Sequence, residues 1–396
     1  MRPHLLLSSD FPPMGGGIAR WMGELTRRYP VGSFVASTGE MDGSDEVDET
    51  YPNRIERCMV RADRLRTLPG LLIWSRQASV LARSIDAEFT WCATLKPCGY
   101  AAKWVRERVG VPFGVIAHGH DFLVLQHQLH RSRLKRRVAR DLLGSASVVV
   151  ANSRWTAQLV RSTFEELELP CGEGRVRVVP LGADAQFFRP GIDPTAAREK
   201  FGLEQGRWLL TVSRLVGHKG LDTAIRALKL LGKGAGDVRY AIVGSGGALG
   251  ELKALAKELG LASRVKFLTN VTDADLPALY NAASVYVGMS RETALNVEGF
   301  GISLAEASAS GLPVVAGRSG GIPDIVADGE TGLLVDTEQP EAVAEALGRV
   351  LGDDSLARRL GTEGRKRVET YFNWDRVAHD MRTIGHEYAG VPVTVG

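Results

Sequence analysis

The stretch VEGFGISLAEASASGLPVVA, residues 297–316, contains a glycine-rich loop, a short helix and an apolar strand in that order. The glycines beside Glu298 oppose helix formation, whereas Ala305–Ser310 favours a helix that Gly311 ends. The run Pro313–Ala316 has the composition of a strand buried in a parallel sheet. Helix followed by buried strand is the unit of an α/β fold, so we expect a parallel sheet covered by helices.

The same unit recurs on both sides of this stretch, in two series separated at Phe188–Gly191. We therefore predict an α/β fold with two Rossmann-like domains, over residues 1–190 and 191–372. A final helix within residues 373–396 is expected to cross back to the first domain. The predicted strands are Leu5–Ser8, Val115–Ala117, Val148–Ala151, Val176–Val179, Trp208–Val212, Tyr240–Val243, Val265–Leu268, Val285–Val287 and Val314–Ala316.

The composition indicates a globular protein of the cytoplasm. Apolar residues make up 44% and charged residues 24% of the 396 residues. No run approaches the roughly 20 apolar residues of a membrane span, and the apolar start is too short for a signal peptide. The four cysteines form no C-x-x-C pair, which is typical of reduced thiols.

Basic residues concentrate in two runs, Arg54–Arg66 and Arg131–Arg140, although the net charge is only +3. Each run is either a solvated helix face or a surface for anionic lipid at the inner face of the cell membrane. Nucleic acid is not expected as a partner, because neither run has interleaved aromatic residues. The segment Glu40–Thr50 is expected to be an acidic surface loop.

Glu298 and Glu306 are candidate ligands of a sugar and a ribose. Free amides at the start of the intervening helix would bind a diphosphate, and the glycines permit its close approach. Eight residues at a helical rise separate the two carboxylates by roughly 12 Å, about the span from a sugar across a diphosphate to a ribose. The alternative is a chance spacing, but a buried Glu306 without a partner would be costly.

Arg214 and Lys219 flank a turn between a strand and a helix that begins near Asp222. A cation near a helix N-terminus is disfavoured unless an anion lies beside it. The pair would hold a diphosphate and stabilise its charge in place of a metal ion. The alternative is two exposed surface cations.

Glycine-rich turns follow the predicted strands Leu5–Ser8 and Tyr240–Val243. Gly15, Gly16 and Gly17 would let a ligand approach the backbone at the carboxyl edge of the sheet, unless they form a simple tight turn. They do not form the G-x-G-x-x-G pattern of dinucleotide sites. Gly244 suits the same purpose in the second domain, and a base is expected between the loop after it and Leu268–Val271, which includes Asn270 and Val271.

His118 follows a predicted strand and is expected either to contact the sugar or to cap the strand. The remaining histidines, including His4 and His386, show no spacing of metal ligands, so no metal and no other cofactor is expected. Asp273-Ala274-Asp275 imitates a metal motif, but its position before Leu276 indicates a helix start.

These motifs together resemble glycosyltransferase family 4, the retaining GT-B enzymes, over nearly the whole chain. Within that family the sequence is most similar to bacterial GDP-mannose-dependent mannosyltransferases that act on phosphatidylinositol mannosides. The residues that carry the resemblance are Phe11-Pro12-Pro13, Gly15–Gly17, His118-Gly119-His120-Asp121, Val179–Asp184, Ser213-Arg214-Leu215, Lys219-Gly220, Asn296–Glu306 and Gly320–Asp324.

The resemblance implies a GT-B fold with the two domains facing a cleft, a nucleotide sugar as co-substrate, and a lipid-linked or glycan acceptor. It implies that Arg214 and Lys219 hold the diphosphate, that Glu306 binds the ribose, and that Glu298 and His118 contact the sugar. Backbone amides from Gly299 through Phe300 and Gly301 to Ile302 would receive phosphate. Met289 and Asp324 depart from the family pattern and bear on the choice of sugar.

Other functions remain open for such a chain. A UDP-sugar-dependent transferase of the family would use the same motifs. A hydrolysing sugar-nucleotide 2-epimerase shares the fold but needs no acceptor, and a non-catalytic binder would keep Arg214, Lys219 and Glu306.

Overall fold

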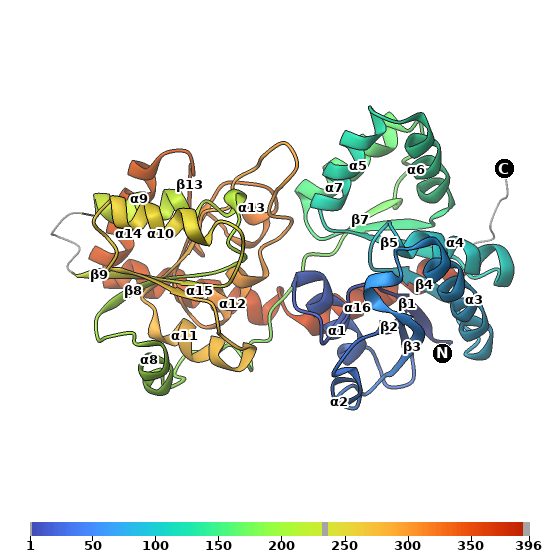
Figure 1. Ribbon diagram of the computed structural model, residues 1–396, viewed down its shortest axis with the longest axis horizontal. Coiled ribbons are helices and arrows are strands. Elements are labelled where there is room, and N and C mark those ends of the chain that lie inside the picture. Colours follow the sequence, from blue (N-terminus) through green and yellow to red (C-terminus); the bar gives the residue numbers. More distant parts are fainter. Residues whose placement is uncertain (1, 232–236, 391–396) are drawn as a thin grey trace. The chain divides into compact units, whose positions relative to one another are not determined.

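A computed structural model describes residues 2–231 and 237–390, which form two compact units (Figure 1). The first unit comprises the chain up to Leu181 together with the segment from Trp374 onward, and the second comprises Gly182–Asn373. The predicted boundary near Pro190 lies just inside the second unit. There the Phe188 ring packs against Tyr280 at 5.6 Å between centroids.

The first unit contains a seven-stranded sheet in the order β3-β2-β1-β4-β5-β6-β7, and each adjacent pair of strands is parallel. This order is that of the Rossmann fold, with one strand added at an edge. The apolar residues Leu5, Leu6 and Leu7 of the first strand are fully buried because helices cover both faces of the sheet. The strands are β1 (His4–Leu7), β2 (Phe34–Glu40), β3 (Arg54–Arg61), β4 (Phe89–Cys92), β5 (Phe113–Ala117), β6 (Val148–Ala151) and β7 (Val176–Val178).

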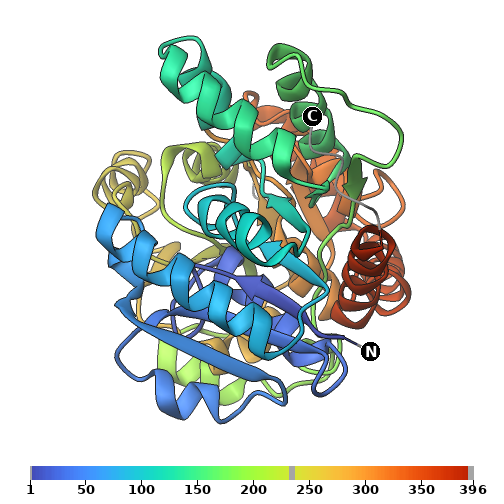
Figure 2. The same cartoon turned by 90° about the vertical axis from the view of Figure 1, so that its right-hand side faces the viewer.

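Helices α3, α4 and α6 pack in series, and Figure 2 shows α3 and α4 side by side. The C-terminal helix α16 packs against α1 and β4, burying Val377, Met381 and Ile384. The helices of this unit are α1 (Gly17–Arg28), α2 (Ser44–Asp48), α3 (Leu68–Ser84), α4 (Cys98–Val109), α5 (His120–Leu129), α6 (Arg133–Ser145), α7 (Arg154–Glu166) and α16 (Trp374–Ala389), with a 3-10 turn η1 (Ala62–Arg64).

The second unit contains a six-stranded parallel sheet in the order β10-β9-β8-β11-β12-β13. Its strands are β8 (Arg207–Val212), β9 (Val238–Val243), β10 (Val265–Leu268), β11 (Val285–Gly288), β12 (Val314–Gly317) and β13 (Leu333–Val335). Its helices are α8 (Thr195–Phe201), α9 (Leu221–Leu230), α10 (Leu249–Glu258), α11 (Leu276–Ala282), α12 (Ile302–Ala309), α13 (Ile322–Ile325), α14 (Pro340–Gly352) and α15 (Asp354–Thr370), with 3-10 turns η2 (Gly217–Lys219) and η4 (Asp273–Asp275).

The strand order reverses between β1 and β4 in the first unit and between β8 and β11 in the second. At such a switch point the loops after the two central strands leave in opposite directions, which opens a crevice at the carboxyl ends. In the second unit, the segments that leave the switch point are the ones that lead to Lys219 and Glu298.

The predicted fold class, with two Rossmann-like parallel-sheet domains, is confirmed. The predicted strands are also present, with small differences at their ends. Asp273-Ala274-Asp275 begins a helical segment, as predicted, with a capping box between Thr272 and Asp275.

Two predictions about charged segments were wrong. The helix-face alternative for Arg54–Arg66 does not hold, because Arg54–Arg61 forms β3 at the edge of the sheet, where Arg54, Met59 and Arg61 are exposed. Its arginines pair with Glu56, Asp48 and Asp42. Glu40–Thr50 is not a simple loop either, because Glu40 ends β2 and α2 follows. The run Arg131–Arg140 does enter a helix, α6.

Within residues 2–231 and 237–390, no helix is both long enough and apolar enough to cross a membrane.

Candidate active site

Lys219 is positioned by a tight turn after β8. The turn η2 ends at Lys219, and Gly220 follows with a φ of 62° before α9 begins at Leu221. A side chain at Gly220 would overlap the carbonyl of Met289, which follows β11. Glycine therefore lets the Lys219 turn pack against the chain that leaves the neighbouring strand.

Glu298 lies in the loop between β11 and α12, as predicted, and its backbone packs against the segment that precedes α13. The carbonyl of Glu298 accepts a hydrogen bond from the Gly321 amide at 2.9 Å. A side chain at Gly320, where φ is 54°, would overlap that same carbonyl. The two glycines before α13 thus allow the close contact that fixes the position of Glu298.

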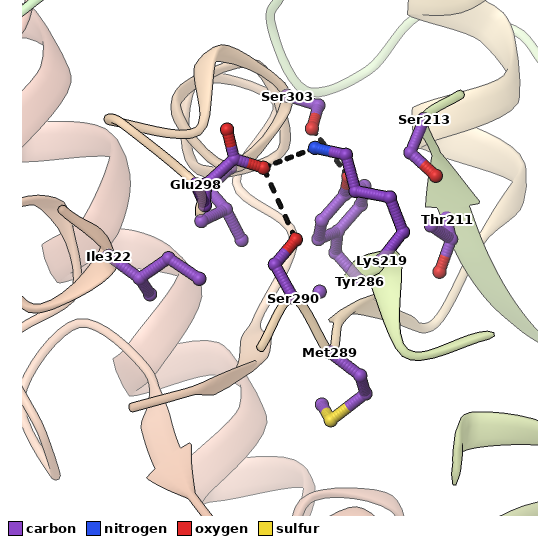
Figure 3. Close-up of a pocket in the computed structure, with 11 residues that line it drawn as sticks. Thr211, Ser213, Lys219, Tyr286, Met289, Ser290, Glu298, Ser303 and Ile322 are labelled. Atoms are coloured by element: carbon purple, nitrogen blue, oxygen red, sulfur yellow. Dashed lines mark hydrogen bonds and ion pairs between the residues drawn. The ribbon is translucent and has the colours of Figure 1, made fainter. Parts of the chain in front are cut away.

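Lys219 and Glu298 form an ion pair between Nζ and Oε2 (Figure 3). Ser290 Oγ donates to the same carboxylate oxygen at 3.2 Å. The side chains of Lys219 and Glu298 are 15% and 20% exposed, so solvent screens the pair only in part. The contacts with Lys219 and Ser290 both involve Oε2, and Oε1 points away from Lys219 (Figure 3).

The Glu298 carboxyl remains ionised at neutral pH. Burial alone would raise its pKa, but the charge of Lys219 and the hydrogen bonds from Lys219 and Ser290 outweigh that effect and hold the pKa below its usual value. The site therefore holds a fixed anion and a fixed cation side by side, which suits a ligand with hydroxyls and phosphates.

A pocket opens beside this pair and reaches the first turn of α12. Gly301, with a φ of 95°, caps the helix, and the Leu304 amide donates to the Gly301 carbonyl at 3.0 Å. The amides of Ile302 and Ser303 come before the first bond that the helix can make to its own carbonyls. Tyr286 Oη lies 2.7 Å from Ser303 Oγ in the pocket wall. The lining residues are Thr211, Ser213, Lys219, Tyr286, Gly288, Met289, Ser290, Glu298, Ser303, Leu304 and Ile322.

Glu306 lies on α12 but does not line this pocket. Its side chain is only 2% exposed, and Tyr280 Oη donates to Glu306 Oε2 at 2.8 Å. The carboxylate thus has the partner that its burial requires. Because α12 begins only at Ile302, the helical rise used to predict the spacing of Glu298 and Glu306 applies to half of the interval.

Arg214, Gly244, Asn270 and Val271 lie at the carboxyl ends of β8, β9 and β10. Gly244 adopts a φ of 134°, and a side chain there would overlap the Ser213 carbonyl, so the two loops are in contact. Arg214 and Asn270 are exposed, and Val271 is half-buried. Arg214 forms no ion pair with any residue that the structure describes.

The predicted residues Gly16, Gly17 and His118 belong to the first unit, at the carboxyl edge of its sheet. Gly16 caps α1 with a φ of 124°, and open space surrounds it, as a ligand-facing glycine requires. Gly17 is the first residue of α1.

His118 follows β5, and its Nε2 lies 2.6 Å from the Ala93 carbonyl. A carbonyl only accepts, so Nε2 carries the hydrogen and Nδ1 is left as the acceptor. The Trp21 ring packs edge-on against the imidazole at 5.2 Å.

Ser290, Tyr286 and Ser303 were not predicted from the sequence. Each is a common residue with no motif of its own, and only the convergence of β8, β11 and α12 brings them to the pocket. The position of Ser290, three residues after a predicted buried strand, was the one available signal.

Comparison with known proteins shows which families and relatives the chain resembles. Residues 15–187 match the model for "Glycosyltransferase Family 4", and residues 193–367 match that for "Glycosyl transferases group 1". A GDP-mannose-dependent α-(1-6)-phosphatidylinositol monomannoside mannosyltransferase of Mycolicibacterium smegmatis is 33% identical, over 93% of this chain and 94% of that protein. A D-inositol 3-phosphate glycosyltransferase of Corynebacterium glutamicum is 33% identical over 64% of this chain and 60% of its own.

Among solved structures, the Anabaena protein HepE in complex with UDP and glucose superposes with a TM-score of 0.78. The match covers 97% of this chain and 99% of that one at 21% identity, which establishes a shared GT-B fold. With two family models that together span most of the chain and a relative that matches it nearly end to end, the protein belongs to glycosyltransferase family 4.

Proposed function

We propose that this glycosyltransferase transfers mannose from GDP-mannose to a lipid-linked acceptor, with retention at the anomeric carbon and without a metal ion. The observation that carries the proposal is the Lys219–Glu298 pair, which lies at the switch point of the second unit beside the N-terminus of α12. A cation, an anion and free helix amides in one pocket match the phosphates and hydroxyls of a sugar nucleotide.

In the proposed complex, the diphosphate lies against Arg214, Lys219 and the amides from Gly299 to Ile302. Glu298 Oε1 accepts from a sugar hydroxyl while Oε2 keeps its bond from Lys219. Glu306 accepts from the ribose, and the base lies near Gly244, Asn270 and Val271. The Lys219 ammonium has three hydrogens, so it can hold Glu298 and a phosphate oxygen together.

The proposed reaction breaks the bond between the anomeric carbon and the phosphate oxygen and forms the acceptor bond on the same face. The acceptor hydroxyl gives its proton to the departing phosphate, so no protein carboxylate acts as the nucleophile. Lys219, Arg214 and the α12 amides stabilise the negative charge that develops on the phosphate, the task that a metal ion performs elsewhere. His118 is the residue of the first unit that we propose as a ligand of the sugar.

The acceptor class follows from the relatives. One is named for a phosphatidylinositol monomannoside and another for inositol 3-phosphate, so both names contain a phosphorylated inositol. We infer that a phosphatidylinositol mannoside is the first acceptor to test.

Helix α6 offers a surface for such a lipid at the inner face of the membrane. Arg133, Lys135 and Arg137 are exposed there, and Leu134 between them is 71% exposed. Arg136 and Arg140 instead pair with Glu166 and Glu168. The lipid-facing part of the run is therefore narrower than its sequence indicates.

The decisive experiment incubates the protein with GDP-mannose and phosphatidylinositol mannosides and analyses the product by NMR. We expect a new glycosidic bond with the donor's anomeric configuration, formed equally well in excess EDTA. An inverted linkage or a requirement for added Mg²⁺ would contradict the mechanism. Transfer from a UDP-sugar would instead favour the UDP-dependent alternative, and a free epimerised sugar would favour an epimerase.

A further inference from the structure

We propose that His4, Glu88 and His386 form a binding site for a divalent metal ion of the Zn²⁺ type. His4 is the first residue of β1, Glu88 directly precedes β4, and His386 lies in the last turn of α16. The site is therefore at the amino ends of the strands in the first unit. His118 and Gly16 lie at the opposite, carboxyl edge of the same sheet, so the ion would take no part in sugar transfer.

The three ligand atoms have the spacing that a metal ion requires. His4 Nε2 lies 3.4 Å from Glu88 Oε1, and His386 Nδ1 contacts that same oxygen. All three atoms lie within 4.8 Å of one another. Ligands bound to Zn²⁺ at about 2.0–2.1 Å in a tetrahedron are about 3.3 Å apart. The distance between His4 Nε2 and Glu88 Oε1 already has this value, whereas His386 Nδ1 must move away from Glu88 Oε1.

Two of these atoms, His4 Nε2 and Glu88 Oε1, are buried and form no regular hydrogen bond in the described part of the chain. His4 is 1% exposed, and Glu88 Oε1 has ion-pair contacts with the nitrogens of the two imidazoles. Buried polar atoms without regular hydrogen bonds are costly, and a bound ion would satisfy both. An imidazole pair with one carboxylate is a ligand set that suits Zn²⁺.

The surrounding residues hold the His4 ring in place. A side chain at Gly385 would overlap the ring, so α16 approaches it as closely as the backbone allows. The Tyr29 hydroxyl lies 3.4 Å from His4 Nδ1. If Nδ1 carries the hydrogen and donates to that hydroxyl, the Nε2 lone pair faces the ion, an arrangement typical of histidine ligands.

Arg382 competes with the ion. Its Nε donates to His386 Nε2 at 3.3 Å, which leaves the hydrogen of the neutral imidazole on Nδ1, directed at Glu88. Binding at Nδ1 requires this hydrogen to move to Nε2 by exchange with water, and the guanidinium to turn away. Removal of Arg382 should therefore strengthen metal binding, a result that a purely hydrogen-bonded cluster does not predict.

The test uses the full-length protein without an affinity tag, with Cys171→Ser to remove the exposed thiol, after dialysis against a chelator. Calorimetry with Zn²⁺ and visible absorption with Co²⁺ measure binding. We expect one equivalent to bind and to raise the melting temperature. His386→Gln and Glu88→Gln should each weaken binding by more than about tenfold, and Arg382→Met should strengthen it several-fold.

His379→Gln is the matched control, because His379 is an exposed histidine on the same helix. It should leave the affinity unchanged. The proposal is overturned if no stoichiometric binding occurs, or if His386→Gln and Glu88→Gln bind Zn²⁺ as tightly as the control. An unchanged circular dichroism spectrum and a cooperative thermal transition show that a variant is folded, and a failure of sugar transfer would leave these metal titrations unaffected.

Discussion

Lys219 and Glu298 are 79 residues apart in the chain, yet Lys219 Nζ donates to Glu298 Oε2. The strand order β8-β11 accounts for the contact, because the two residues lie in the segments that follow adjacent central strands. Gly220 and Gly320 allow the backbones on either side to approach closely enough. The strand order therefore brings the two charges together. Substitution of each residue in turn tests what its charge contributes.

The first prediction concerns Lys219→Ala. Loss of a charged hydrogen bond to phosphate costs about 1.5–3 kcal/mol, so GDP affinity should fall roughly tenfold to a hundredfold. Calorimetry with GDP measures the loss. Lys229→Ala removes an exposed lysine from α9 and should change nothing. Equal GDP affinity in the two variants would refute the diphosphate assignment.

The second prediction separates two roles of Glu306. If the buried carboxylate binds the ribose, Glu306→Ala should weaken GDP binding severely and should abolish the preference for GDP over 2′-deoxy-GDP. Tyr280→Phe removes only the hydroxyl that donates to Glu306, and it should keep that preference. Should both variants lose stability to the same extent and retain full discrimination, Glu306 is a structural partner of Tyr280 only.

The third prediction is a pH dependence of stability. The folded-state pKa of Glu298 lies below its unfolded value. Between these two pKa values the folded protein therefore binds fewer protons than the unfolded protein does. The stabilisation is complete above about pH 4.5 and is lost as the pH falls through the folded-state pKa. Glu298→Gln cannot ionise, and its unfolding free energy should fall less steeply between about pH 5 and pH 3. Denaturant unfolding at a series of pH values measures both slopes, and identical slopes would contradict the ionised pair.

How much of this site the sequence predicts depends on whether a residue acts through its local motif. Lys219, Gly220, Glu298 and Gly301 lie in turns whose glycines mark them, and their places in the loops were predicted. The contact between Lys219 and Glu298 could not be predicted, because it depends on which strands are neighbours. His4 and His386 illustrate the same limit, since 382 positions apart in the sequence they share one carboxylate in the fold.

The missed strands have a related cause. β3 lies at a sheet edge and carries Arg54, Glu56, Arg57 and Arg61, so its pattern is dominated by charge rather than by apolar residues. β13 has three residues, too few for any period to be visible. A buried strand that is a continuous apolar run, such as β6, was predicted. The buried strands β2 and β4 were missed as well, because polar residues such as Thr38 and Thr90 interrupt their apolar pattern.

The fourth prediction concerns α6 and anionic lipid. The double variant Arg133→Glu, Lys135→Glu should lose binding to vesicles that contain phosphatidylinositol, and wild-type binding should fall steeply as salt rises, since charges are screened over about 10 Å at 0.1 M. Co-sedimentation with phosphatidylcholine vesicles, with and without phosphatidylinositol, measures this. Lys253→Glu, Lys257→Glu makes the same charge change on α10 and should bind as the wild type does. Salt-insensitive binding, or equal loss in both double variants, would leave α6 as a solvated face.

The last prediction concerns the base of the donor. The expected base site lies near Gly244, Asn270 and Val271, at the carboxyl ends of β9 and β10. Gly244 donates its amide to the Leu268 carbonyl at 2.9 Å, which holds the two loops together at this edge. Guanine offers a larger stacking face and more edge donors than uracil, so a site fitted to it should prefer GDP over UDP by one to two tenfold steps, about 1.4 kcal/mol each.

Titration with GDP, UDP and ADP tests this preference. Asn270→Ala should bring the affinities for GDP and UDP closer together and should leave the affinity for inorganic pyrophosphate nearly unchanged. The Asn270 side chain is exposed, so its truncation leaves the packing of the core unchanged. The variant therefore reports on recognition of the base rather than on folding. Tighter binding of UDP than of GDP would assign the enzyme to UDP-sugars. The roles proposed for Lys219, Glu298 and Glu306 would then stand, because the diphosphate and ribose are common to both donors.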